Sequence, residues 1–141
     1  MTLLEKALGI ALEAHKGQKD KAGEPYILHP IRVMMAVQTE EEKIVALLHD
    51  VIEDSSATIE DLRKHGFDDR ILDAVQSLTR NPSLVSYEDT IERIKKTPIA
   101  ANVKLADLED NMNIKRIKKV TDKDLKRIKK YHNAWSVLNK L

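Results

Sequence analysis

The segment ALLHDVIEDS, residues 46–55, places four ionisable side chains inside an apolar stretch. His49 and Asp50 form one pair, and Glu53 and Asp54 form a second pair one helical turn later. A solvated helix end would accept the two later acids, but the apolar residues before them predict a buried segment. Buried imidazoles and carboxylates cost free energy unless they are paired or bind a metal ion. The segment therefore predicts a helix that brings polar groups into the protein core.

Helix starts recur along the chain as a Ser or Thr followed three residues later by an acid. Apolar residues recur three and four positions apart between these starts, and no segment alternates with the period of a strand. We predict helices at residues 2–16, 30–38, 40–54, 58–65, 68–79, 86–96, 98–116 and 121–139. The sequence thus predicts an all-α fold, with residues 1–141 forming a single domain.

The composition is that of an ordinary soluble domain, with 141 residues, 42% of them apolar and 33% charged. The chain has no cysteine, which excludes disulfides and thiolate metal sites. A net charge of +1 argues against a dedicated nucleic-acid binder. The N-terminus does not resemble a signal peptide, and no apolar run reaches the roughly 18 residues of a membrane span. We expect a soluble, cytoplasmic protein without a membrane partner.

A second segment, KLADLEDNM at residues 104–112, also interrupts an apolar run with polar groups. Asp107 and Asn111 are four residues apart and share one helix face. His29 lies at a predicted junction between a loop and a helix. Each residue has an ordinary explanation when taken alone, such as a loop histidine or a salt-bridged core acid. Together with the first segment they predict a divalent metal site, whose mixed nitrogen and oxygen ligands suit Zn, Mn, Fe, Co or Ni better than Ca or Mg.

Three motifs in order resemble a known family: AHKGQKDKAGEPYILHP at residues 14–30, ALLHDVIEDS at residues 46–55 and VKLADLEDNM at residues 103–112. They resemble the HD superfamily of metal-dependent phosphohydrolases and, more narrowly, RelA/SpoT-type alarmone hydrolases, including their small stand-alone members. The resemblance covers about residues 11–112 and implies an HD-type helical bundle.

The resemblance also implies roles for individual residues. The implied metal ligands are His29, His49, Asp50 and Asp107, with Mn²⁺ as the usual ion of the family. Glu53 and Asp54 would flank the attacking water and act in proton transfer. Lys21 and Asn111 match substrate-binding positions, although a solvated loop lysine explains Lys21 equally well. The implied reaction removes the 3′-pyrophosphate of guanosine tetra- or pentaphosphate (ppGpp or pppGpp), a small phosphorylated nucleotide.

Two positions depart from the family pattern. Asp20 precedes Lys21 where an arginine is common, and Asp110 stands where the family has a histidine. An arginine can stack on a guanine ring, whereas an aspartate cannot and would repel phosphate. Both changes lower the positive charge expected near a polyanionic substrate. We hypothesise that catalysis is retained while base specificity or affinity has shifted.

The last third of the chain is basic, with nine Lys or Arg against two Asp in residues 115–130. We interpret this as the solvated face of a final helix that could also attract an anionic substrate. The buried face of this helix should contain Leu125, Ile128, Tyr131, Trp135 and Leu138, and we expect Tyr131 to pack rather than bind ligand. The chain contains only one Trp, one Phe and three Tyr and lacks the pattern of basic and aromatic residues typical of RNA-binding surfaces, which argues against RNA binding.

Two other functions stay open at this point. One is an HD phosphatase acting on another nucleotide or on a phosphorylated dinucleotide cofactor, which the departures at Asp20 and Asp110 favour. The other is a nucleotide-binding module without turnover, against which the acids Glu53 and Asp54 count. The sequence predicts no oligomeric state.

Overall fold

Helices begin where the sequence supplies capping groups. Thr2, Thr39, Thr58 and Thr121 each accept a hydrogen bond from the N–H three residues on and form a reciprocal capping box. The structure, a computed structural model that describes residues 1–140, contains helices α1 (Leu3–Ala14), α2 (Leu28–Ala36), α3 (Glu40–Leu48), α4 (Val51–Asp54), α5 (Ile59–Lys64), α6 (Asp69–Leu78), α7 (Tyr87–Lys95), α8 (Pro98–Asn111) and α9 (Asp122–Asn139), with a 3₁₀ turn at Ile114–Arg116. These described residues include no strand, which confirms the all-α prediction.

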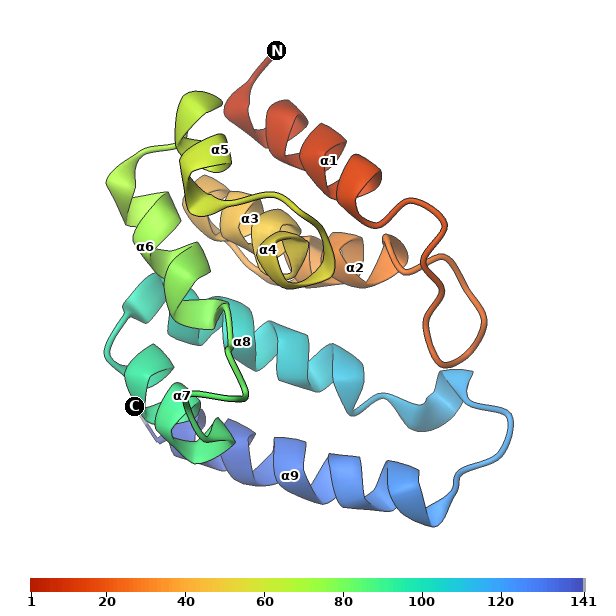
Figure 1. The fold of residues 1–141 in the computed structure, drawn as a ribbon. Helices are drawn as coiled ribbons and strands as arrows, with labels where there is room; N and C mark the ends of the chain where they lie inside the picture. The colour runs from red at the N-terminus through yellow and green to blue at the C-terminus, as the bar shows by residue number, and fades with distance from the viewer. Residues whose placement is uncertain (141) are drawn as a thin grey trace.

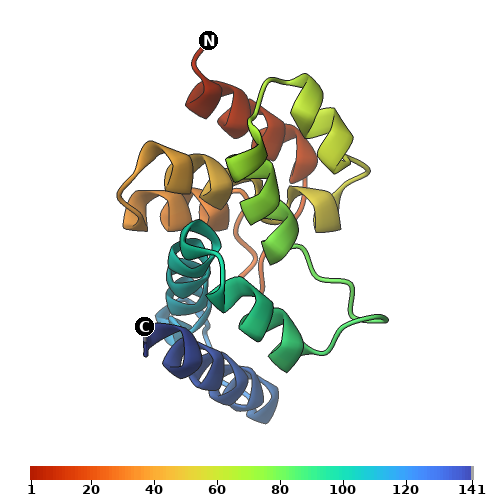
Figure 2. The same ribbon diagram turned by 90° about the vertical axis from the view of Figure 1, so that its left-hand side faces the viewer.

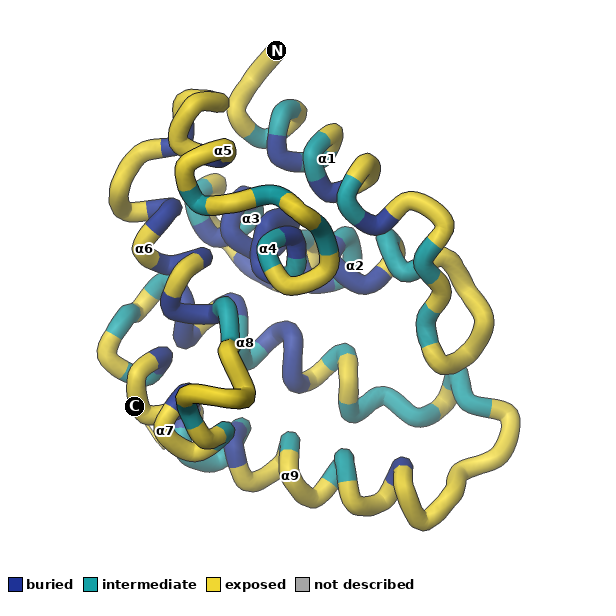
Figure 3. Tube along the Cα trace, viewed as in Figure 1, coloured by how far each residue is buried: buried dark blue, intermediate teal, exposed yellow. Residues whose placement is uncertain are grey.

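Helix α3 lies at the centre of the fold, and residues 44–48 are buried on all sides. Helices α1, α2, α6 and α8 contact it, while α9 packs against α7 and α8 on the far side (Figures 1 and 2). The buried part of the chain is concentrated in α3 and in the helices facing it, whereas the outer face of α9 is exposed (Figure 3). The buried part of α3 leads directly into His49 and Asp50, where the regular helix stops.

The predicted continuous helix over residues 40–54 is wrong, because α3 ends at Leu48 and α4 begins at Val51. Nδ1 of His49 lies 2.5 Å from the carbonyl oxygen of Ala46. In an uninterrupted helix that oxygen would accept the N–H of Asp50, four residues later. The side chain of His49 therefore competes with the helical hydrogen-bond pattern and ends the helix.

Two other sequence predictions need correction. The helix expected over residues 98–116 ends at Asn111, since Asn113 is extended and its side chain caps the following 3₁₀ turn. Leu125 was expected in the core, but 55% of its surface is exposed. Leu138, near the other end of α9, is fully buried. Within residues 1–140, no helix combines the length and apolar character needed to cross a membrane.

Leu47→Ala should lower the free energy of unfolding by about 2–5 kcal/mol, because the side chain is fully buried in α3 and its loss leaves a cavity. Leu125→Ala is the matched control and should cost less than about 1 kcal/mol, since its side chain is mostly in water. Urea denaturation of the two variants measures both values. Equal losses would contradict the assignment of α3 as the core helix.

Candidate active site

Four side chains from α2, α8 and the break between α3 and α4 meet inside the protein. Nε2 of His29 lies 2.8 Å from Oδ1 of Asp107 and 3.9 Å from Oδ2 of Asp50. Nε2 of His49 lies 3.0 Å from the same Asp50 oxygen and 3.4 Å from the same Asp107 oxygen. His29, His49 and Asp107 are buried, and Asp50 is partly buried. The structure thus brings together the four residues that the sequence suggested as metal ligands, which we call the four-residue cluster.

His49 directs an unused nitrogen at this cluster. Because Nδ1 donates to the carbonyl of Ala46, Nε2 is the nitrogen whose lone pair becomes available when the ring is neutral. Among residues 1–140, Nε2 is buried and has no hydrogen-bond partner despite the nearby carboxylates. An unpartnered buried polar atom is rare in proteins. A metal ion bound at Nε2 would supply the missing partner.

His29 is oriented by a network on the opposite side of its ring. Its Nδ1 lies 2.7 Å from Oδ2 of Asp110, and Nε of Arg32 donates to the other carboxylate oxygen over 2.8 Å. Arg116 adds a hydrogen bond to the backbone carbonyl of Asp110. Metal-binding histidines in proteins commonly donate their second ring nitrogen to a carboxylate in this way. Asp110 therefore fixes the ring of His29 with Nε2 facing the cluster.

Asp107 is held from both sides along one face of α8. Lys104 donates to Oδ2 over 2.9 Å, and the amide of Asn111 donates to Oδ1 over 3.1 Å. Burial raises the pKa of Asp107, but the charge of Lys104 and the hydrogen bonds with His29 and His49 together hold that pKa well below its usual value. Asp107 thus remains an anion in a buried position.

Tyr26 performs a similar task for Asp50, with its hydroxyl donating to Oδ2 over 2.5 Å. Burial and the charge of Asp50 both raise the pKa of Tyr26, which keeps the hydroxyl protonated as a donor. Burial raises the pKa of Asp50. The charge of His49 and the hydrogen bonds with His49 and Tyr26 lower it, and the net result is a pKa of about 2. Both carboxylates of the cluster are therefore ionised near neutral pH.

The charge of the cluster also fits a divalent cation. Burial lowers the pKa of His49, but the negative charges and hydrogen bonds of Asp50 and Asp107 together raise it well above its usual value. Burial likewise lowers the pKa of His29, and its hydrogen bonds with Asp107 and Asp110 raise it overall. Both shifts report excess negative charge around the imidazoles. Ligand atoms of His29, His49 and Asp50 lie within 4.8 Å of one another, a spacing that a single ion can bridge.

Glu53 and Asp54 sit on the short helix α4, one turn beyond the cluster. Oε1 of Glu53 accepts the backbone N–H of Arg80 over 2.5 Å. Partial burial raises the pKa of Glu53, and the charges of Asp50 and Asp54 act in the same direction. Asp54 accepts a hydrogen bond from Gln18 over 3.2 Å. The two acids thus have different surroundings, since Glu53 binds the backbone of Arg80 and Asp54 binds the side chain of Gln18.

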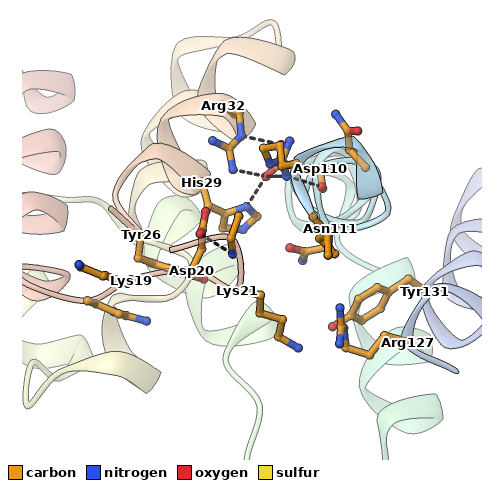
Figure 4. A pocket seen from close by; sticks show the side chains of 15 residues that line it. Lys19, Asp20, Lys21, Tyr26, His29, Arg32, Asp110, Asn111, Arg127 and Tyr131 are labelled. Atoms are coloured by element: carbon orange, nitrogen blue, oxygen red, sulfur yellow. Dashed lines mark hydrogen bonds and ion pairs between the residues drawn. The ribbon is translucent and has the colours of Figure 1, made fainter. Parts of the chain in front are cut away.

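An open cavity of about 370 Å³ lies beside the cluster and has several basic side chains in its walls. Figure 4 shows Lys21 and Arg127 on one side of it and the Arg32–Asp110 pair on the other. Burial and the charge of Arg127 both lower the pKa of Lys21. Asn111 and Tyr131 also line this cavity, which we call the basic pocket. Tyr131, expected only to pack, therefore faces a space that could hold a ligand.

The two aspartates that depart from the family pattern both accept hydrogen bonds from neighbouring groups. Oδ1 of Asp20 accepts the N–H groups of Ala22 and Glu24 and so stabilises its own loop. Asp110 is bound by Arg32 and by His29 and lies 3.5 Å from Arg116. The charge of Asp110 is therefore paired with cationic side chains, whereas Asp20 has backbone partners. The effect of the two acids on phosphate binding stays a prediction.

Sequence reasoning missed several residues of this site. Tyr26 precedes His29 by three residues, a one-turn spacing that could have suggested a contact at the cluster. Nδ1 of the buried His15 lies 3.6 Å from Oδ2 of Asp54, a contact that the residues around His15 do not signal. Arg32 follows His29 by one turn of α2, a spacing that could also have suggested a contact, whereas Arg127 comes from α9 and no local pattern signals its approach.

Comparison with known proteins places this geometry in a family. A family model described as "HD domain" matches residues 7–130. The chain belongs to the HD domain family. This HD domain is 29% identical to a guanosine-3′,5′-bis(diphosphate) 3′-pyrophosphohydrolase of Aquifex aeolicus, over 98% of this chain and 23% of that protein. It is 34% identical to the protein of the same name from Vibrio cholerae, over 77% of this chain and 17% of that protein.

A solved structure also resembles this HD domain, with a TM-score of 0.79 and 27% identity over 98% of this chain and 85% of that one. It is described as a metazoan ortholog of SpoT that hydrolyses ppGpp. The chain spans less than a quarter of the length of the two bacterial relatives. The HD domain family implies a divalent metal, in agreement with the donor set of the four-residue cluster.

Asp110→Ala should weaken the binding of a divalent cation about 10- to 100-fold, because His29 loses the carboxylate that orients its ring. Titration with Co²⁺, followed by visible absorption, measures this affinity without any turnover. Glu109→Ala removes an equal charge from the adjacent, exposed position and should leave Co²⁺ affinity within about two-fold. Wild-type Co²⁺ affinity in Asp110→Ala would contradict the positioning role.

Proposed function

We propose that this HD domain is a metal-dependent hydrolase that removes the 3′-pyrophosphate of ppGpp and pppGpp. The observation that carries the proposal is the juxtaposition of the four-residue cluster with the basic pocket. Two imidazoles and two carboxylates suit one divalent cation, and the lysine and arginines beside them suit the phosphates of a nucleotide. The names of the relatives support the same substrate.

In this proposal His29, His49, Asp50 and Asp107 hold the metal, which we take to be Mn²⁺. When bound, the cation lowers the pKa of water and neutralises phosphate charge. The chain's own groups keep the ligands ready for it. Asp110 and the Ala46 carbonyl fix the two imidazoles, while Lys104 keeps Asp107 ionised.

Glu53 and Asp54 would accept and donate the protons that are transferred in the reaction. The water oxygen bonds to the phosphorus attached to ribose O3′, and the P–O3′ bond breaks. The released pyrophosphate contains the oxygen from water, and O3′ stays on the nucleotide. The water loses a proton and O3′ gains one. Partial burial and the charges of Asp50 and Asp54 raise the pKa of Glu53, which makes it a better proton acceptor than an ordinary glutamate.

Lys21 and Asn111 would contact the substrate from the walls of the basic pocket. Lys21 and the neighbouring Arg127 provide positive charge, and Asn111 provides an amide next to Asp107. A substrate of this kind is a small cytoplasmic molecule, so we place the enzyme in the cytoplasm.

The second candidate is a phosphatase for another phosphorylated nucleotide or dinucleotide cofactor. The observation that favours it is the loop at Asp20, where no arginine side chain is available to stack on a guanine. Under this alternative the metal ligands and Glu53 keep their roles, and only the occupant of the basic pocket differs.

Metal-loaded protein should release pyrophosphate from ppGpp, and removal of the metal by a chelator should abolish release until Mn²⁺ is restored. Pyrophosphate and the nucleotide product are quantified by ion-exchange chromatography. Parallel assays with GTP and with NADPH test the base and the alternative substrate class. Release of phosphate from NADPH without hydrolysis of ppGpp would replace the first proposal by the second.

Glu53→Gln combined with Asp54→Asn should lower turnover about 10²- to 10⁴-fold, the range expected for loss of a proton-transferring group. Binding of Co²⁺ should persist, because neither residue belongs to the four-residue cluster. Glu60→Gln, an exposed acid on α5, is the control and should retain full turnover. Full turnover in the double variant would refute the assigned roles and would favour another proton carrier.

A further inference from the structure

Three cationic side chains surround the ring of Tyr87, and none of them lines the basic pocket. The ring centroid lies 4.2 Å from Nζ of Lys130, 5.3 Å from Cζ of Arg80 and 5.9 Å from Nζ of Lys104. Arg80 comes from the connection between α6 and α7, Lys104 from α8 and Lys130 from α9. The fold thus gathers three positive charges from separate elements. We call them the cationic cluster.

There are fewer negative charges near the cationic cluster than positive charges in it. Lys104 is paired with Asp107, but within residues 1–140 neither Arg80 nor Lys130 forms an ion pair. Glu53 binds the backbone N–H of Arg80 and leaves its guanidinium free. Burial and repulsion from Arg80 and Lys104 lower the pKa of Lys130, and only Glu88 opposes them.

Unused hydrogen-bonding groups accompany this excess charge. Nε of Arg80 and the hydroxyl of Tyr87 are both buried and have no partner among the described residues. The face of the Tyr87 ring attracts cations. That attraction neither cancels their charge nor offers an acceptor to Nε of Arg80. An anion with several acceptor oxygens would both neutralise the positive charge and accept a hydrogen bond from Nε of Arg80.

The position of the cationic cluster relates it to the candidate active site. Lys104, Asp107 and Asn111 follow one another along one face of α8, spaced by three and four residues. Asn111 lines the basic pocket, Asp107 belongs to the four-residue cluster, and Lys104 belongs to the cationic cluster. From Lys104 to Asn111 the helix rises about 10 Å. The metal ligands therefore lie between two positively charged regions.

We propose that the cationic cluster is a subsite for the outer phosphate of a 3′-pyrophosphate. The nucleoside end of the substrate occupies the basic pocket, the inner phosphate lies over the four-residue cluster, and the outer phosphate is bound by Arg80 and Lys130. This inference rests on the proposed function and deepens it. It explains how the site selects a diphosphate over a monophosphate at the ribose 3′ position.

The test is binding of inorganic pyrophosphate and of orthophosphate to the metal-loaded full chain, by calorimetry at one fixed Mn²⁺ concentration. Wild-type protein should bind pyrophosphate at least about ten-fold more tightly than orthophosphate, because only the longer ion reaches both sets of charges. Arg80→Gln and, separately, Lys130→Gln should each weaken pyrophosphate binding about five- to ten-fold and leave orthophosphate binding within about two-fold.

Lys129→Gln is the matched control, since Lys129 is an equally exposed lysine next to Lys130 that does not approach the Tyr87 ring. It should change neither affinity by more than about two-fold. Lys130 is exposed, so its replacement does not threaten folding and keeps the test decisive if Arg80→Gln is unstable. Unchanged pyrophosphate affinity in Lys130→Gln, or equal losses for both anions, would overturn the subsite.

The binding experiment is independent of turnover. If ppGpp is not hydrolysed but the variants lose affinity for pyrophosphate and not for orthophosphate, the subsite is supported and the proposed substrate is refuted. If ppGpp is hydrolysed and the variants bind both anions like wild type, the substrate is supported and the subsite is refuted.

Discussion

The hydrogen bond from Nδ1 of His49 to the carbonyl oxygen of Ala46 has two structural consequences. It removes an acceptor from the pattern of α3 and ends the most deeply buried helix of the protein. It also leaves Nε2 as the free nitrogen and directs it at the carboxylates of Asp50 and Asp107. Without the break, residues 49 and 50 would diverge by about 100° around a regular helix. One local contact therefore allows an apolar core to contain a polar site.

Burying four potential ligands together is costly, and the surrounding residues offset much of that cost. Each imidazole has its outer nitrogen fixed, His29 by Asp110 and His49 by a backbone carbonyl. Asp107 has Lys104 on one side and Asn111 on the other. Positive charge is thus supplied by the chain outside the ring of ligands, while the centre stays negative. That arrangement suits a divalent cation rather than an anion.

Most of the helical fold could be predicted from the sequence, because caps and apolar spacing are local signals. The predicted helix boundaries are wrong where side chains form hydrogen bonds that compete with those of the helical backbone. His49 interrupts a helix that periodicity alone continues to Asp54, and Asn113 caps a turn where periodicity predicts more helix. Leu125 fits the apolar stripe of α9, yet α8 does not cover it.

The candidate site was predictable to the extent that its residues form local motifs. His49, Asp50 and Asp107 stand out because acids and imidazoles interrupt apolar runs. Their supporting partners are less visible, since Arg32 reaches Asp110 across 78 positions of sequence. A single sequence carries no record of such pairs, and the sign of a residue's charge says little about its effect. Asp110 looked like a loss of positive charge, and it is instead the orienting partner of a histidine.

The loop that forms one wall of the basic pocket is held by its own backbone. Asp20 accepts two N–H groups within the loop, and Lys19 forms an isolated bridge with Pro25. The side chains at its tip, Lys21 among them, therefore do not support the packing of α2, α3 or α8. Substitutions there can alter which ligand the basic pocket accepts while the four-residue cluster remains in place. Ligand preference and catalytic chemistry can thus evolve separately in this protein.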